Sequence, residues 1–256
     1  KVDYEERTPV FDPEEAMHLT DYKIHETGNI YRVEKVKRGN VEEALKNSAY
    51  VVTKTYETPA QEHAFLEPES ALAVPEGDHL TVYTGGQSIY DEYREIRRLL
   101  GISESCLTVR GAYVGGAFGG KEDMSVQHHA ALLAYIAKVP VQVTLTREES
   151  LMVHPKRHPM KMVLTTGCDK KGKLTAMKLR LISDTGAYAS LGGPVLQRAC
   201  THAAGPYNYQ NIDIIGTSVY TNNVPSGAFR GFGVTQTIFA TECNLNLLAE
   251  KVGIDP

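Results

Sequence analysis

A glycine-rich segment between a predicted strand and a predicted helix constrains the fold of this chain most. In GGAFGGKE (115–122), four of six consecutive residues are glycine. The residues before it alternate as a strand does, and 122–138 are rich in Ala and Leu, as in a helix. We therefore expect backbone amides and the positive end of a helix dipole to open on one cleft. The alternative is that these glycines only permit a tight turn.

The spacing within this segment excludes two common nucleotide-binding motifs. A P-loop needs four residues between its glycines and a Ser or Thr after its Lys, whereas Glu122 follows Lys121 here. The GxGxxG spacing of a dinucleotide fingerprint is also absent. The cleft at this loop is therefore expected to bind an anion or an oxo group of a ligand other than these nucleotides. Two further glycine loops, TGGQ (84–87) and GAFRGFG (227–233), also precede predicted helices, so we expect three loops to converge.

The remaining pattern mixes strands and helices without a regular βαβ repeat. Residues 160–188 predict a long hairpin with its turn at DKKGK, and FDPEEAMHL predicts a short helix with Asp12 as N-cap and Pro13 in the first turn. Met160 and Met162 alternate on a strand and are expected in the core. Further strands are predicted at 48–58, 79–86 and 211–222, and further helices at 88–100 and 235–252. The predicted class is α+β, with mixed sheets and packed helices.

Composition excludes several functions. The formal charge of −4 and the lack of a run of basic residues argue against a nucleic-acid partner. The four cysteines form no CxxC, which excludes a sequence-local zinc ribbon or iron–sulfur cluster. No stretch resembles a transmembrane helix or a signal peptide, so we expect a cytoplasmic protein without a membrane partner. The histidines, at positions 63, 128, 129, 154 and 158 among others, show no metal-binding spacing and are interpreted as ordinary helix and loop residues.

The three loops, taken in order, resemble the molybdenum-cofactor-binding subunit of the xanthine dehydrogenase and aldehyde oxidoreductase family, the molybdenum hydroxylases. The resemblance extends to YEERTPVFDPEEA (4–16), QEHAFLEPESALA (61–73), RHP (157–159) and DTGAYAS (184–190), and so covers nearly the whole chain. It implies the first molybdopterin-binding half of the large subunit. Residues 1–39 would be an approach segment after the family's a/b hammerhead domain, and 40–256 an incomplete cofactor-binding domain.

The resemblance also implies the cofactors and partners. The cofactor would be a molybdenum-pyranopterin, either molybdopterin or its cytosine dinucleotide. A 2Fe-2S cluster and FAD would lie on partner domains or subunits, in a hetero-oligomer that dimerises. The reaction would hydroxylate an electron-poor carbon with oxygen taken from water. A carbon monoxide-oxidising member would carry a cysteine in the loop at 227–233, and this chain has none.

Particular positions match the family's cofactor contacts. Gln87 corresponds to a glutamine that hydrogen-bonds a metal oxo ligand, and its amide N–H suits that acceptor. Phe118 and Arg230 would also lie beside the metal's ligands, Arg230 through its backbone amide. The alternatives are that Gln87 caps the following helix and that Phe118 is a core ring. The whole set implied to contact the cofactor is Gln87, Gly116, Ala117, Phe118, Gly119 and Arg230.

Three further positions match substrate contacts of purine-hydroxylating members. Glu122 and Arg198 would lie on either side of the substrate ring as the catalytic pair, and Phe232 would sandwich it. A carboxyl group can exchange hydrogen bonds with a purine, and a guanidinium can stabilise negative charge on an exocyclic oxygen. A xanthine- or hypoxanthine-type heterocycle is therefore the expected substrate. Taken singly, Glu122 would be an ordinary first-turn helix carboxylate and Arg198 a surface arginine.

Other functions stay open. The chain could belong to an aldehyde oxidoreductase of the same family, or be a catalytically silent assembly domain. The family's catalytic glutamate lies in a downstream segment, so no residue here is assigned as the base, and Glu122 is expected only to orient substrate. The non-Met start and abrupt end lead us to expect a fragment that is inactive alone.

Overall fold

The computed structural model describes residues 2–256 and divides into two compact units. Unit 1 consists of Lys1–Gln61, His158–Ser226 and Gly231–Pro256, and unit 2 of Glu62–Arg157 and Gly227–Arg230. The chain therefore leaves unit 1 for unit 2 and returns twice. No helix within these described residues is long and apolar enough to span a membrane.

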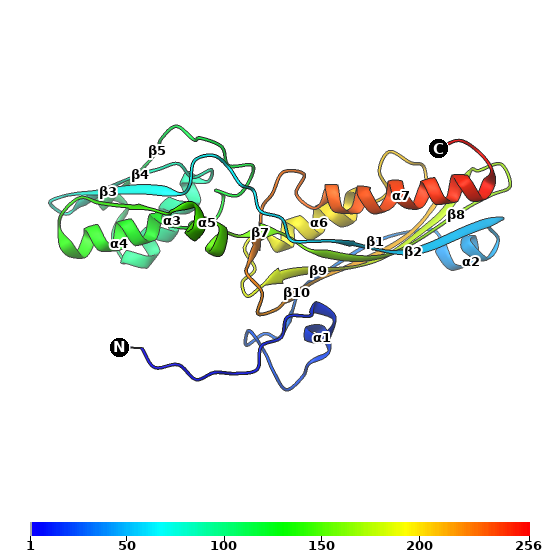
Figure 1. Cartoon of the computed structure of the whole chain (residues 1–256), viewed down its shortest axis with the longest axis horizontal. Coiled ribbons are helices and arrows are strands. Elements are labelled where there is room, and N and C mark those ends of the chain that lie inside the picture. Colours follow the sequence, from blue (N-terminus) through cyan, green and yellow to red (C-terminus); the bar gives the residue numbers. More distant parts are fainter. Residues whose placement is uncertain (1) are drawn as a thin grey trace. The chain divides into compact units, whose positions relative to one another are not determined.

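Unit 1 is built on a five-stranded sheet in the order β1-β10-β9-β8-β2 (Figure 1). Its pairs are antiparallel except β9 with β10, which run parallel. The predicted hairpin is confirmed, since Asp169 accepts hydrogen bonds from the amides of Lys171 and Lys173 and thereby closes the turn. The strands are β1 (Ile30–Arg38), β2 (Tyr50–Thr58), β8 (Met160–Cys168), β9 (Leu174–Gly186) and β10 (Asn211–Tyr220).

Helices cover both faces of this sheet. The helices α6 (Gly192–His202) and α7 (Val234–Val252) lie along one face, while α1 (Pro13–His18) and α2 (Val41–Lys46) lie on the other (Figure 1). Asp12 caps α1 and Pro13 stands in its first turn, as predicted. The main core lies under α6 and α7 and includes Met160 and Met162, which confirms their expected burial. The strand β1 lies within the predicted approach segment, and the boundary at residue 39 stays a prediction.

Unit 2 is built on a four-stranded sheet in the order β5-β4-β3-β6. The pair β4–β5 is parallel and the others are antiparallel. Its core contains Leu80, Val82, Ile96 and Ala130, and it lies where α3 and α4 cover the sheet. The strands are β3 (Ser70–Glu76), β4 (His79–Thr84), β5 (Leu107–Gly111) and β6 (Val141–Thr144). The helices are α3 (Ile89–Leu100), η1 (Glu104–Cys106), α4 (Gln127–Ala137) and α5 (Arg147–Val153).

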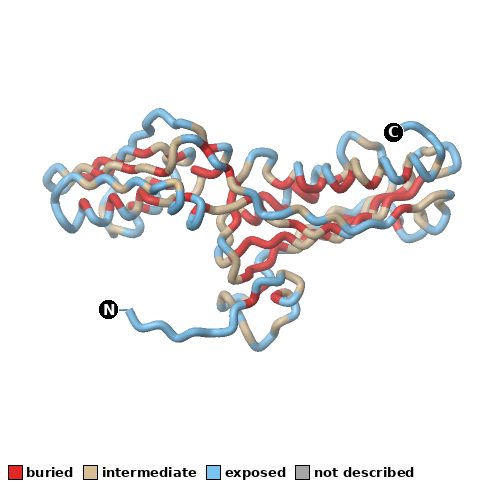
Figure 2. The backbone as a smooth tube through the Cα atoms, viewed as in Figure 1, coloured by how far each residue is buried: buried red, intermediate tan, exposed pale blue. Residues whose placement is uncertain are grey.

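Each unit buries its own apolar strip. Figure 2 shows the buried positions concentrated on the sheets and on the sides of the helices that face them. Two short strands, β7 (Lys156–Arg157) and β11 (Ser226–Gly227), also pair with each other. Helices packed on sheets that combine parallel and antiparallel strands confirm the α+β class.

Candidate active site

The first glycine loop is longer than the sequence predicts, because α4 begins at Gln127 and not at Glu122. The side-chain oxygen of Gln127 accepts hydrogen bonds from the amides of Ser125 and Val126, at 2.9 and 3.0 Å. It thus satisfies donors just ahead of the helix, where the chain is still turning. The expectation that the glycine loop leads directly into the helix is therefore wrong. Glu122 is half-buried in a turn and is not a first-turn helix carboxylate.

The backbone of this loop is turned by residues in the left-handed region. The φ angles are 98° at Gly116, 54° at Phe118 and 96° at Gly119. Such angles are free of strain only for glycine, so the conformation of Phe118 is strained. The ring of Phe118 is 49% exposed, so the alternative that it is a core ring is wrong, whereas its neighbour Ala117 is buried. The loop therefore presents an aromatic ring to solvent from a constrained backbone.

Gln87 holds this loop from the side through its side chain. Its side-chain Oε1 accepts hydrogen bonds from the backbone amides of Gly119 and Lys121, at 2.9 and 3.3 Å. The backbone amide of Gln87 donates to the Lys121 carbonyl at 2.7 Å. It does not cap α3, whose N-cap is Ser88. Within residues 2–256, Nε2 of this exposed glutamine has no hydrogen-bond partner. The loop thus fixes the orientation of the Gln87 side-chain amide and leaves its Nε2 donor free.

The second glycine loop meets the first within unit 2. The amide of Arg230 donates to the Phe118 carbonyl at 2.9 Å. A Cβ on Gly119 would lie 3.1 Å from the carbonyl of Ala228, so the two backbones touch. The predicted convergence is confirmed for TGGQ, GGAFGG and residues 227–230. Because the Arg230 amide is already bonded to Phe118, a cofactor would have to share it.

The loop is also anchored by Glu67, to which no sequence pattern assigned a role. The Glu67 carboxylate accepts hydrogen bonds from the Gly115 amide at 2.6 Å and from the buried ammonium of Lys121 at 2.9 Å. These two donors hold the pKa of Glu67 below its ordinary value. Lys121 also lies 4.7 Å from the centre of the Phe65 ring. Glu67 therefore connects the two ends of the glycine segment.

Arg198 and Phe232 lie together in unit 1. Arg198 is exposed on α6, and its guanidinium carbon lies 5.2 Å from the centre of the Phe232 ring. Phe232 is half-buried and also has a positive φ, of 49°. Glu122 belongs to unit 2 and takes part in an interaction within the chain. Its pairing with Arg198 across a substrate stays a prediction.

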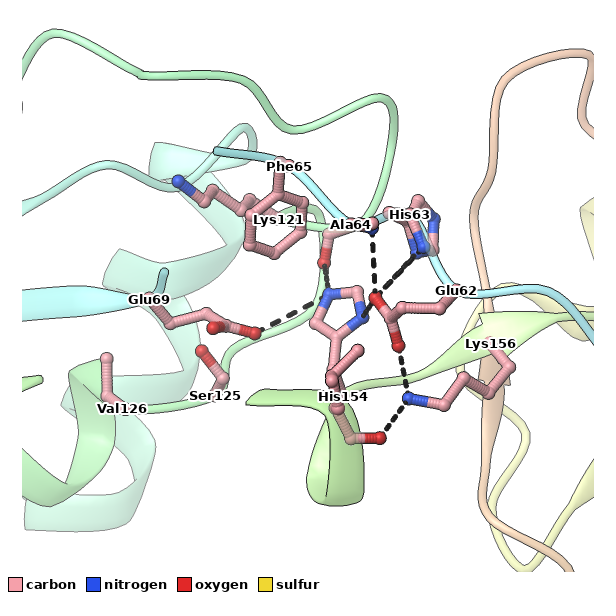
Figure 3. Close-up of polar contacts among 12 residues, drawn as sticks. Glu62, His63, Ala64, Phe65, Glu69, Lys121, Ser125, Val126, His154 and Lys156 are labelled. Atoms are coloured by element: carbon pink, nitrogen blue, oxygen red, sulfur yellow. Dashed lines mark hydrogen bonds and ion pairs between the residues drawn. The ribbon is translucent and has the colours of Figure 1, made fainter. Parts of the chain in front are cut away.

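Beside the two loops, unit 2 contains a cluster of the buried His63 and His154 with the half-buried Glu62 (Figure 3). Nε2 of His63 lies 2.7 Å from the carbonyl of Ala228, and Nε2 of His154 lies 2.7 Å from that of Gly120. Each imidazole therefore contacts one glycine loop.

Burial lowers the pKa of His63 to about 4, outweighing the Ala228 hydrogen bond. Burial would raise the pKa of Glu62, but Lys156 and His154 outweigh it and leave that pKa below its usual range.

Little in the sequence indicates this cluster. His63 and His154 are far apart in the chain, and neither forms a recognisable ligand spacing. The only indirect signal is the segment 61–73, which the resemblance covers without a role for His63, and His154 lies outside the segments that carry the resemblance. Of the other histidines, His128 and His129 have ring centres 4.0 Å apart on α4.

The chain matches the molybdopterin cofactor-binding domain family over residues 24–256. It is 42% identical to a probable xanthine dehydrogenase subunit of Bacillus subtilis, covering 100% of this chain and 34% of that protein. It is 41% identical to the nicotinate dehydrogenase large molybdopterin subunit of Eubacterium barkeri, with 100% and 60% covered. Among solved structures, the aldehyde oxidoreductase from Desulfovibrio gigas is similar, with a TM-score of 0.96, 27% identity, and 100% and 29% covered. The chain thus spans between 29% and 60% of the length of these relatives.

Proposed function

The chain belongs to the molybdopterin cofactor-binding domain family, and on that premise we propose that it forms the substrate-facing part of a molybdenum hydroxylase for purines or similar N-heterocycles. When bound, the molybdenum-pyranopterin cofactor supplies the two-electron oxidation chemistry. The proposal includes a 2Fe-2S cluster and FAD on partner domains or subunits. Two relatives are named for xanthine and nicotinate, which are both N-heterocycles, and the proposal assigns a substrate of that class to this chain.

The observation that supports this proposal most is the fixed amide of Gln87. Its Oε1 is committed to the amides of Gly119 and Lys121, so its Nε2 donor projects away from the loop. An oriented, exposed N–H donor suits an oxo ligand of a metal, which is an acceptor. The close approach of Gly119 to the Ala228 backbone packs the two glycine loops directly against each other. These residues fit the cofactor that the family binds.

The proposed substrate contacts use side chains of this loop and of unit 1. Phe118 offers an exposed aromatic face. The half-buried Glu122 already takes part in an interaction within the chain, and in the proposal its carboxylate also accepts a hydrogen bond from a ring N–H group. On unit 1, Arg198 and Phe232 offer a cation above an aromatic ring. In the proposal, Glu122 and Arg198 orient the heterocycle, and Arg198 stabilises negative charge that develops on an exocyclic oxygen.

The test is a pair of substitutions in the complete, natively assembled protein. Glu122→Ala and Arg198→Ala should each lower kcat/KM for a purine by about 5- to 150-fold, because removing a hydrogen-bond partner in a polar site costs about 1–3 kcal/mol. Gln197→Ala, an exposed neighbour on α6, is the matched control and should leave kcat/KM unchanged. Unchanged purine kcat/KM in both Glu122 and Arg198 variants would contradict the substrate assignment.

Two other functions remain as alternatives. The similarity to the D. gigas aldehyde oxidoreductase favours an aldehyde-oxidising enzyme of the same family. In that case the assembled protein would oxidise aldehydes in preference to every purine and N-heterocycle in a substrate panel. A catalytically silent assembly domain would instead lack stoichiometric molybdenum even after cofactor loading, which metal analysis measures directly.

A further inference from the structure

We propose that Glu62, His63 and His154 form a binding site for a divalent transition metal of zinc-like chemistry, separate from the molybdenum cofactor. One ligand atom from each of the three residues lies within 4.8 Å of the other two (Figure 3). Two imidazole nitrogens and one carboxylate oxygen are a donor set that Zn²⁺ accepts, with water in a fourth position.

The hydrogen bonds of the two rings fix which nitrogen is available. Nε2 of His63 and Nε2 of His154 each lie 2.7 Å from a backbone carbonyl, that of Ala228 and that of Gly120. A carbonyl oxygen only accepts, so each Nε2 must carry the proton. A ring nitrogen that donates to a backbone carbonyl, while the other faces a metal, is the usual arrangement of a metal-binding histidine.

The remaining nitrogens point at one oxygen. Nδ1 of His154 lies 3.3 Å and Nδ1 of His63 lies 3.9 Å from Oε1 of Glu62. Both Nδ1 atoms are buried without a hydrogen-bond partner, and both side chains are fully inaccessible to solvent. If both rings are neutral, two lone pairs face a carboxylate. A proton on Nδ1 of His154 would pair that ring with Glu62 but leave Nδ1 of His63 without a partner, whereas one metal ion would engage both nitrogens.

The carboxylate itself is held as ligating carboxylates are. Oε2 of Glu62 accepts a hydrogen bond from the Lys156 ammonium, and Oε1 accepts from the amides of His63 and Ala64 at 2.9 and 3.3 Å. A second carboxyl group, that of Glu69, is 3% exposed, has both oxygens without a hydrogen-bond partner, and lies 3.7 Å from Nε2 of His154. Glu62 is only half-buried, so an ion can enter from its side.

The site would connect the two glycine loops. An ion that fixes both imidazoles fixes the Gly120 carbonyl through His154 and the Ala228 carbonyl through His63. Binding should therefore slow hydrogen exchange in both loops at once. This role does not depend on the molybdenum cofactor or on the substrate, so it can be tested without either.

The experiment is zinc titration of the purified chain after removal of metals with a chelator. We expect one tightly bound Zn²⁺ per chain by metal analysis after dialysis. Co²⁺ in its place should give the visible absorption of a four- or five-coordinate site. His63→Gln and His154→Gln each should weaken zinc binding about 100-fold or more, since loss of an outer partner alone costs about 10–100-fold. His129→Gln, at an exposed histidine, is the matched control and should bind zinc as the wild type does.

Hydrogen exchange of the wild type provides a readout that does not depend on the variants folding. Zinc should protect 62–65, 116–122 and 227–230 together. Three results would overturn the proposal: zinc that dialysis removes from the wild type, binding unaffected by either histidine substitution in folded variants, and zinc-dependent protection confined to other segments.

Discussion

At the scale of single residues, two glycines of unit 2 show different reasons why a position can require glycine. Gly119 combines a φ of 96° with an approach to the Ala228 carbonyl so close that a Cβ would lie 3.1 Å from it. Gly77 shares a positive φ, of 62°, but has nothing within 4 Å. Substitutions at Gly77 therefore test backbone strain alone, whereas substitutions at Gly119 test backbone strain together with close packing.

Gly119→Ala should destabilise the chain more than Gly77→Ala. The left-handed conformation alone costs an L-residue about 1–2 kcal/mol, and at Gly119 the neighbouring backbone must also move. We expect a loss in the free energy of unfolding of about 1 kcal/mol for Gly77→Ala and about 2 kcal/mol or more for Gly119→Ala, measured by urea denaturation. Equal losses would show that the contact with Ala228 is unimportant.

Glu92 is a second residue whose surroundings oppose its ordinary state. It is fully buried, and its Oε2 has no hydrogen-bond partner. Burial raises the pKa of Glu92, and hydrogen bonds from Thr84 and Gln127 offset this only in part. The unfolded chain ionises this group at about pH 4.3, so the folded state loses stability as the pH rises from there to the raised pKa.

Glu92→Gln should therefore stabilise the chain at pH 7 and change little at about pH 3, where both states of the wild type carry a neutral carboxyl group. Urea denaturation at the two pH values measures this difference. Glu95→Gln, on the exposed side of the same helix, should show no such gain. A destabilised Glu92→Gln variant at pH 7 would mean that the buried carboxylate is satisfied in solution.

At the scale of elements, local signals predict most helices and strands, and the exceptions have local causes. The helix α3 ends at Leu100, as predicted, and is followed by Gly101, whose φ is 63° and whose amide donates to the Arg97 carbonyl. The predicted start of α4 is too early, because an Ala- and Leu-rich composition gives no indication of the turns that follow Gly119. The N-cap of α4 is Val126, and no side-chain capping bond is present there. The Gln127 side chain instead accepts from the two amides that precede the helix, a pattern that the capping rules do not include.

The helix α5 tests the value of a cap within unit 2. Thr146 and Glu149 form a complete capping box, each accepting a hydrogen bond from the other's amide. Thr146→Ala should lower the free energy of unfolding by about 1 kcal/mol. Ser88→Ala is the matched control, because the N-cap side chain of α3 makes no capping bond to the backbone. Thermal or urea denaturation compares the two, and similar losses would argue against the box as a stabilising feature.

At the scale of the whole molecule, two cores are made from interleaved stretches of chain. Leu164 lies in the core of unit 1 and Leu80 in the core of unit 2, each almost fully buried. A substitution in one core should therefore affect chiefly the strands of its own unit.

Leu164→Ala and Leu80→Ala should each cost about 2–5 kcal/mol, the usual range for a buried leucine. Hydrogen exchange should show the lost protection in β8 and β9 for Leu164→Ala, and in β3 and β4 for Leu80→Ala. Equal loss of protection in both units for either variant would mean that they unfold as one.

The sequence by itself determined the α+β class, the hairpin, the helix stops and the glycine loops, because periodicity, φ preferences and caps act over a few residues. Motif resemblance added the cofactor-binding family, which the match over residues 24–256 supports. Only the tertiary structure brought Glu62, His63 and His154 together, placed Arg230 on Phe118, and set Arg198 above Phe232. Those contacts join residues far apart in the chain, and their distances depend on how whole sheets and loops pack, which no local pattern encodes.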